Sequence, residues 1–271
     1  MSKSNTGTKL SDLCDDLEGC KLGKISDEDL FKQPPPLEDC PICFQRMPSL
    51  SSTGSKYKAC CGKVICSGCI YAPVYDNQGN IIAEKKCPFC RTPSPTSDEE
   101  SLERERKRVE AGDAYAIGKL GSYYADGLYG YPQDYKKALE LYHRVVELGS
   151  AKAYNDIGVA YMYGEGVDVD KRKAGHYYQL AAIGGSVVAR HNLGNDEVLS
   201  CNYERALKHF IIAVRGGSNS SLEMIKQMYS NGDATKEDYT IALQSYQAYL
   251  GEIKSTQRDK AAAASERYRY C

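Results

Sequence analysis

Tryptophan is absent from the 271-residue chain, and histidine occurs only four times. No apolar run is long enough to span a bilayer, and the N-terminal residues lack the apolar core of a signal peptide. The formal net charge is −1, so no excess of positive charge favours nucleic acid or an anionic membrane. The nucleophile motif Gly-x-Ser-x-Gly and the phosphate-binding P-loop are also missing, which removes support for a hydrolase or a kinase. We therefore expect an intracellular protein, cytoplasmic or nuclear, that binds neither nucleic acid nor membrane.

Cysteine, by contrast, is abundant, with 12 residues in the chain. Eight of them form three Cys-x-x-Cys pairs and one adjacent pair: Cys40 and Cys43, Cys60 and Cys61, Cys66 and Cys69, Cys87 and Cys90. The Cys-x-x-Cys spacing lets two sulfurs converge on one tetrahedral Zn²⁺, and eight thiolates suffice for two closed sites. Because nothing directs the chain to an oxidising compartment, metal binding is favoured over disulfides. We interpret the remaining cysteines as free thiols: Cys14, Cys20, Cys201 and Cys271.

The residues on either side of the cysteine module (39–93) are polar. Residues 1–38 lean acidic, and we expect them to be a mostly disordered leader. Residues 94–110 form a linker and a charged helix, which Ser97 or Thr96 would cap, since acidic residues follow in the first turn. Opposite charges lie one turn apart on this helix, so we interpret it as a solvated helix and not as a basic recognition helix.

An internal repeat begins near residue 111. Leu120-Gly121 is echoed by Ile157-Gly158 and Leu193-Gly194. Apolar residues at i, i+3 and i+4 around these motifs predict paired helices, which bury their stripes only by stacking on neighbouring pairs. The sequence therefore predicts an all-α solenoid in which small residues such as Gly158 let helices approach and tyrosines fill the seams. The expected units are residues 111–149, 150–185, 186–217 and 218–250, followed by a helical cap and a frayed tail at 251–271.

These units resemble Sel1-like repeats, the tetratricopeptide-related helical hairpins. The resemblance lies in Leu-Gly-x-x-Tyr, in Gly-x-Gly-Val (164–167), in Asp-x-x-Lys-Ala (170–174) and in Ala-Ala-x-x-Gly (181–185). The second unit matches best, the third is shortened and the fourth is degenerate. The resemblance implies a stack of helix pairs that binds protein partners and carries no catalytic group.

The cysteine module resembles a RING finger, a small α+β module stabilised by two zinc ions. Because ligand pairs interleave in that family, the resemblance assigns Cys40, Cys43, Cys66 and Cys69 to the first zinc and Cys60, Cys61, Cys87 and Cys90 to the second. One departure is Cys61-Gly62-Lys63, where a typical RING has Cys-Gly-His. Either both Cys60 and Cys61 bind the second zinc, or only one does and that site is weak or empty.

RING fingers of the ligase type bring a ubiquitin-charged conjugating enzyme next to a substrate, without a covalent intermediate of their own. By this resemblance Ile42 and Pro88 would contact the conjugating enzyme, and Arg91 would bridge it to ubiquitin. The alternative is that Ile42 and Pro88 only pack the loops and that Arg91 is a solvated charge. Pro73 stands where many ligases carry a tryptophan, which indicates a short or altered central helix.

Two functions thus stay open from the sequence. In the first, the chain is a RING-type E3 ubiquitin-protein ligase whose repeats bind a protein substrate or adaptor. In the second, it is a non-catalytic zinc-binding scaffold in which both parts bind proteins.

Overall fold

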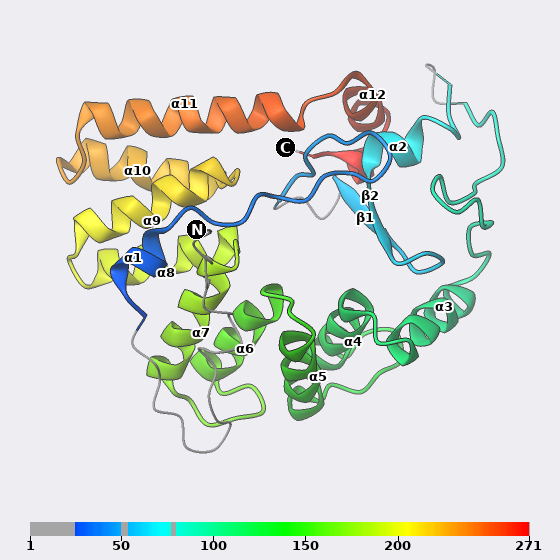
Figure 1. Cartoon of the computed structure of the whole chain (residues 1–271), viewed down its shortest axis with the longest axis horizontal. Helices are drawn as coiled ribbons and strands as arrows, with labels where there is room; N and C mark the ends of the chain where they lie inside the picture. Colours follow the sequence, from blue (N-terminus) through cyan, green and yellow to red (C-terminus); the bar gives the residue numbers. More distant parts are fainter. Residues whose placement is uncertain (1–24, 50–53, 77–79, 271) are drawn as a thin grey trace, which may run out of the picture. The chain divides into compact units, whose positions relative to one another are not determined.

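The computed structural model describes residues 25–49, 54–76 and 80–270 (Figure 1). It forms two compact units, each assembled from two separate stretches of chain. One unit combines Met1–Pro35 with Ile117–Leu193, and the other combines Pro36–Ala116 with Gly194–Cys271. The cysteine module and the C-terminal helices therefore belong to the same unit.

Helix pairs make up the repeats. They are α4 (Ala114–Asp126) with α5 (Tyr135–Glu147), α6 (Lys152–Tyr163) with α7 (Lys171–Ile183), α8 (Val187–Leu199) with α9 (Tyr203–Arg215), and α10 (Asn219–Asn231) with α11 (Lys236–Ile253). In the first unit α6 packs against α5 and α7, and in the second α9 packs against α10 and α11. The predicted helical solenoid is confirmed, and even the degenerate fourth repeat forms a helix pair.

The glycine of each Leu-Gly motif makes room for an aromatic ring on the second helix of its repeat. A Cβ atom on Gly158 would lie 2.7 Å from the ring of Tyr178, closer than any real contact. The ring is almost fully buried, so it has no room to retreat. This close approach, expected from the sequence, recurs as Gly121 with Tyr142 and Gly194 with Phe210.

The cysteine module contains little regular structure. Strands β1 (Ser55–Lys58) and β2 (Lys63–Cys66) form an antiparallel hairpin, with Ser55 opposite Cys66 and Lys58 opposite Lys63. Helix α2 (Ser67–Tyr71) follows β2 directly and is only five residues long. The buried core of the cysteine module consists mostly of cysteine side chains, together with Met47 and Ile65.

Helix α3 (Asp98–Glu110) follows the module. The side chain of Ser97 accepts a hydrogen bond from the backbone N–H of Glu100, so the predicted cap is confirmed. None of its residues is buried, in agreement with a solvated helix.

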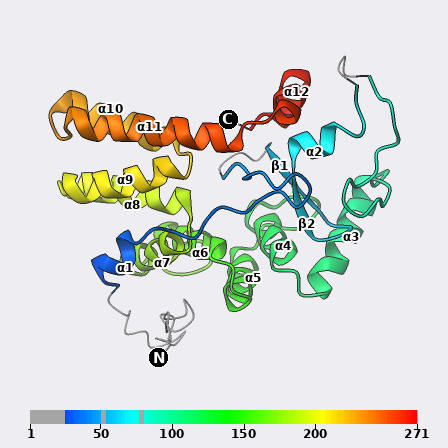
Figure 2. The same ribbon diagram turned by 45° about the horizontal axis from the view of Figure 1, so that its top comes forward.

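The C-terminal segment differs from the expected cap and frayed tail. Helix α12 (Thr256–Ala264) packs against α2 of the cysteine module, as Figures 1 and 2 show. A short 3₁₀ helix, η2 (Glu266–Tyr268), follows it, and Tyr270 is only 6% exposed. The last expected helix of the repeats is thus followed by a segment that belongs structurally to the cysteine module.

The expected disordered leader also needs correction for the residues that the structure describes. Helix α1 (Asp27–Phe31) packs against α7, and its Leu30 is 2% exposed. Composition does not predict a short helix with one deeply buried leucine, because acidic residues surround this leucine in the sequence. Residues 1–24, with Cys14 and Cys20, lie outside the described residues.

Candidate metal centres and the adjoining pocket

The first Cys-x-x-Cys pair lies in a tight backbone loop. The N–H of Phe44 donates to the carbonyl of Cys40 at 2.9 Å, and the N–H of Cys40 donates to the carbonyl of Gln45 at 2.9 Å. Phe44 adopts φ of 56°, the left-handed region that L-residues seldom occupy. The loop therefore turns back on itself and points both thiols to one side.

The last Cys-x-x-Cys pair repeats this geometry. The N–H of Arg91 donates to the carbonyl of Cys87 at 2.9 Å, and the N–H of Cys87 donates to the carbonyl of Thr92 at 2.8 Å. Arg91, like Phe44, follows the second cysteine of its loop and has φ of 64°. Two loops far apart in sequence thus present pairs of sulfurs in the same way.

The adjacent cysteines sit in the turn of the β1–β2 hairpin. The N–H groups of Cys61 and Gly62 both donate to the carbonyl of Lys58, and Gly62 completes the turn with φ of 69°. The Cys61 sulfur lies 3.8 Å from that of Cys87, and Cys60 and Cys90 are 3.4 Å apart. The sharp turn required by neighbouring ligands is therefore present, and both sulfurs face the same pair.

The eight thiols form two compact groups, each with its four sulfurs within 4.8 Å of one another. The groups are Cys40, Cys43, Cys66, Cys69 and Cys60, Cys61, Cys87, Cys90, the same interleaved sets that the RING resemblance implies. A tetrahedron with Zn–S bonds of about 2.3 Å has sulfur–sulfur edges of about 3.8 Å. The distances Cys43–Cys66 and Cys61–Cys87 are both 3.8 Å. All the cysteines that the structure describes are free thiols, so this donor set fits Zn²⁺.

The environment of the hairpin thiols does not favour thiolates without a cation. Burial raises the pKa of the Cys60 thiol and of the Cys61 thiol. Four thiolates packed this closely would also repel each other. A bound divalent cation would supply the compensating charge and release the thiol protons. Lys63, where a typical RING has histidine, is exposed at the start of β2 and lies outside both groups.

A buried arginine of helix α12 forms hydrogen bonds with the backbone of the loop that contains Cys40 and Cys43. Arg258 is 0% exposed, and its Nη1 donates to the carbonyls of Arg46 at 2.7 Å and Ile253 at 2.6 Å. Its Nη2 donates to the carbonyl of Gln45 at 3.3 Å, the same carbonyl that Cys40 uses to close the loop. A guanidinium can hold several carbonyls at once because its donors form a rigid fork. The C-terminal helix thereby holds the backbone of the loop that carries Cys40 and Cys43.

Close backbone packing brings α12 onto α2. A Cβ atom on Gly68 would lie 2.8 Å from the backbone nitrogen of Arg258, so only glycine fits at this crossing. The ring of Tyr268 meets that of Tyr71 edge to face at 5.6 Å, and Lys56 lies 5.1 Å over the Tyr268 ring. No sequence pattern predicts this docking, since glycines and arginines are ordinary in helices.

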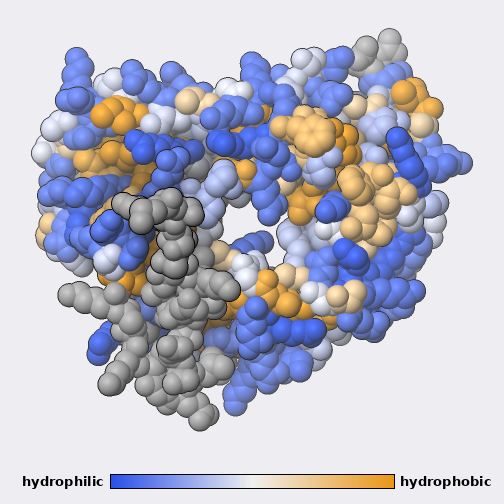
Figure 3. Space-filling view, in the orientation of Figure 1, coloured by the Kyte–Doolittle hydropathy of each residue, from blue (hydrophilic) through white to orange (hydrophobic). Residues whose placement is uncertain are grey.

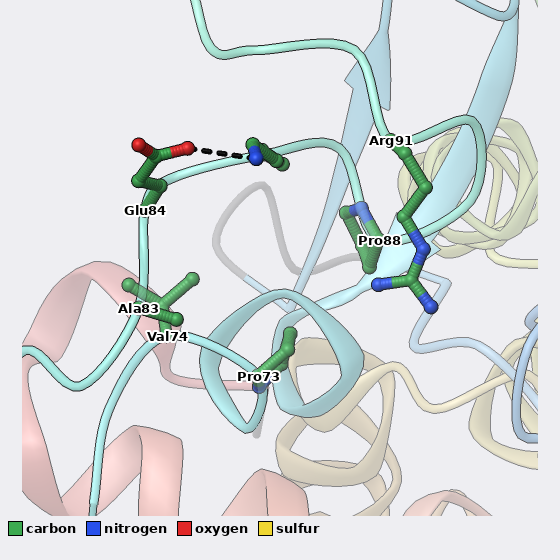
Figure 4. Close-up of a pocket in the computed structure, with 7 residues that line it drawn as sticks. Pro73, Val74, Ala83, Glu84, Pro88 and Arg91 are labelled. Carbon is green, nitrogen blue, oxygen red and sulfur yellow. Dashed lines mark ion pairs between the residues drawn. The ribbon is translucent and has the colours of Figure 1, made fainter.

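A pocket of about 420 Å³ lies between the end of α2 and the loop that contains Cys87 and Cys90. It is lined by Pro73, Val74, Ala83, Glu84, Lys86, Pro88 and Arg91 (Figure 4). Lys86 forms an ion pair with Glu84 at 2.7 Å, and this contact lowers the pKa of the Glu84 carboxyl. The pocket thus places apolar side chains, such as that of Pro88, next to the Arg91 guanidinium.

The three predicted contact residues are placed differently. Pro88 and Arg91 share the pocket, whereas Ile42 is half-buried and packs against the cysteine core. The module also exposes large apolar side chains, among them Phe44, Ile81 and Phe89. In the space-filling view of Figure 3, apolar patches lie among hydrophilic residues over the module and over other parts of the chain.

Comparison with known proteins supports the repeats directly. The model of the Sel1 repeat family matches residues 114–150, 151–186 and 189–218, which confirms the Sel1-like repeats expected from the sequence. The fourth helix pair, α10 and α11, follows the matched residues. None of the described helices is long and apolar enough to cross a membrane.

Individual relatives share only parts of the chain. The E3 ubiquitin-protein ligase GW2 of Oryza sativa subsp. indica is 38% identical over 87 residues, which are 28% of this chain and 18% of that protein. The protein sel-1 homolog 2 of Mus musculus is 31% identical over 108 residues, 38% of this chain and 16% of that protein. The ERAD-associated E3 ubiquitin-protein ligase component HRD3B of Arabidopsis thaliana is 32% identical over 100 residues, 36% of this chain and 15% of that protein. The chain thus spans less than a fifth of the length of these relatives.

Among solved structures, a Sel1 repeat protein from Oxalobacter formigenes is similar, at 29% identity with a TM-score of 0.49. The match covers 64% of this chain and 68% of that one.

Proposed function

We propose that this chain is a RING-type E3 ubiquitin-protein ligase whose Sel1 repeats recruit a protein substrate or adaptor. The observation that carries the proposal is the pair of interleaved four-cysteine groups, with Pro88 and Arg91 in one pocket beside the second group. The partial similarity to the ligase GW2 and to the ligase component HRD3B points the same way.

Zinc would be the resident metal, held by the eight cysteines. Bound zinc stabilises the loops and takes no part in the transfer of ubiquitin. Since a module with so little regular structure has a small apolar core, metal binding would contribute much of its folding free energy.

The residues of the pocket would position the conjugating enzyme. Pro73 and Pro88 offer an apolar surface for a loop of that enzyme, and Ile42 would extend the contact from the first loop. Arg91 would donate hydrogen bonds to ubiquitin and to the enzyme at the same time. Transfer would be faster because the thioester is held in a reactive geometry next to the acceptor lysine.

The position of the Arg91 side chain supports this role. Because φ is 64° at this residue, its side chain leaves the loop in a direction that an ordinary backbone would not give. In Figure 4 the Arg91 guanidinium extends beside Pro88 and borders the pocket.

Autoubiquitination across a panel of conjugating enzymes tests this proposal. We expect chain formation with at least one enzyme, and a loss of about tenfold or more in Arg91→Ala and in Ile42→Ala. Lys85→Ala is the matched control, because Lys85 is an exposed cation near the same loop that does not line the pocket. If no enzyme supports chain formation, the chain is a zinc-binding scaffold; if both variants retain full activity, the site assignment is wrong.

A further inference from the structure

The segment before the cysteine module is seated on the repeats like a bound peptide. Leu30 is 2% exposed and belongs to a core cluster with residues of α7 and α8. Ile25 and Phe31 pack against the same cluster, whereas the acidic residues 27–29 are exposed. The segment therefore presents apolar anchors to the repeats and an acidic face to solvent.

An arginine of the repeats holds the main chain of this segment. Arg190, on α8, is 1% exposed, and its Nη1 donates to the carbonyl of Leu30. Its Nη2 donates to the carbonyl of Ala182 at 3.1 Å, near the end of α7. Burial lowers the pKa of Arg190 to about 10, so the side chain remains charged at neutral pH. The Nη2 atom thus bonds the guanidinium to the repeats, and the Nη1 atom donates to the backbone of the docked segment.

The contact continues beyond α1. A Cβ atom on Gly185 would lie 3.7 Å from Cδ of Pro35, so the proline run passes close to the turn after α7. A five-residue helix is too short to be stable alone in water, so α1 depends on this surface for its fold. The segment also lies far in sequence from the repeats that it covers. These are features of a short linear peptide docked on a helical surface.

We infer that the α7–α8 surface of the repeats is a peptide-recognition site, occupied in cis by residues 25–35. Its partner in trans would be a protein segment of the same chemistry, a short helical turn that presents a leucine and a second large apolar residue to the repeats and its polar residues to solvent. This inference rests on the proposed role of the repeats in partner binding, but it requires neither zinc nor ligase activity. The chain's own segment would then compete with the partner.

The competition has a predictable size. A tethered segment has an effective concentration in the millimolar range. If the free peptide has a dissociation constant of about 0.1 mM, the cis segment weakens partner binding about tenfold, because the free site is populated only about a tenth of the time.

Fluorescence anisotropy with a labelled synthetic peptide of residues 25–35 tests the inference on the full-length chain. We expect Leu30→Asp, which removes the anchor of the cis segment, to bind the probe about tenfold more tightly than the wild type. Glu28→Gln is the matched control, because Glu28 is exposed on the same helix, and it should bind as the wild type does. Phe31→Asp provides a second opened variant if Leu30→Asp does not fold by circular dichroism.

Two further measurements distinguish specific recognition from non-specific hydrophobic binding. A probe with alanine in place of leucine should not bind the opened variant, and adding Arg190→Met to that variant should weaken probe binding at least fivefold. Equal binding by the opened variants and the wild type would overturn the inference, as would no binding by folded opened variants at millimolar probe. A failed ubiquitination assay would leave this result untouched, so the two proposals fail separately.

Discussion

Replacing Arg258 with methionine should loosen the first candidate metal-binding loop. The side chain is fully buried and donates three hydrogen bonds to carbonyls, two of them in the loop at Gln45 and Arg46. Methionine keeps much of the packing volume but removes every donor. A hydrogen bond from a charged donor contributes about 1.5–3 kcal/mol, and the three share one side chain, so we expect a total loss of about 3 kcal/mol.

Urea unfolding and zinc release to a colorimetric chelator measure this effect on the full-length chain. Since about 1.4 kcal/mol corresponds to tenfold, partial coupling of the loop to the metal should speed zinc release at least tenfold. Lys254→Met is the matched control, because Lys254 is exposed just before α12, and it should change stability by less than about 0.5 kcal/mol. If Arg258→Met behaves as this control does, α12 does not support the metal module and the reasoning fails.

Two further predictions concern the repeats. Gly158→Ala should destabilise the chain by about 1–3 kcal/mol because its Cβ would meet the buried Tyr178 ring, whereas Gly175→Ala, with nothing within 4 Å, should gain up to about 1 kcal/mol from helix propensity. Thermal unfolding distinguishes them, and equal shifts would refute the packing argument. Burial lowers the pKa of His176, so the unfolded chain takes up a proton below pH of about 6.5 that the folded chain resists, and stability falls as the pH drops. His176→Gln should therefore lose less stability than the wild type between pH 7 and pH 5 in urea titrations; parallel losses would contradict this.

The two four-cysteine groups and the repeats were predictable because their signals are local. Thiols at Cys-x-x-Cys spacing and a helical repeat with Leu-Gly motifs each require only a few neighbouring residues to be recognised. The adjacent Cys60 and Cys61 left two alternatives from the sequence, and the hairpin turn with Gly62 shows how both sulfurs reach one group.

The docking of residues 25–35 and of α12 was not predictable in the same way. Leu30 lies in an acidic stretch, and Arg258 lies in an alanine-rich helix with charged neighbours, so both segments have the composition of solvent-exposed tails. Their burial depends on partners far away in sequence, such as Arg190 for Leu30 and Gln45 for Arg258. Composition and periodicity carry no information about such long-range contacts.

The proposed contact residues show that motif position alone does not predict which side chains line one pocket. The resemblance grouped Ile42, Pro88 and Arg91 by motif position, but only Pro88 and Arg91 line one pocket. Ile42 packs partly into the cysteine core, so its substitution would disturb the loop as well as any contact with a partner. This is why Arg91→Ala is the sharper test of the proposed ligase activity.

Native mass spectrometry of the full-length chain tests the central claim most directly, because it counts the metal ions per molecule. The two four-cysteine groups predict two Zn²⁺ in the wild type and in Cys201→Ser, whose thiol is exposed outside both groups. Cys61→Ser should retain only one Zn²⁺, held by the group that contains Cys40. A single Zn²⁺ in the wild type, or two in Cys61→Ser, would contradict the account of the second site.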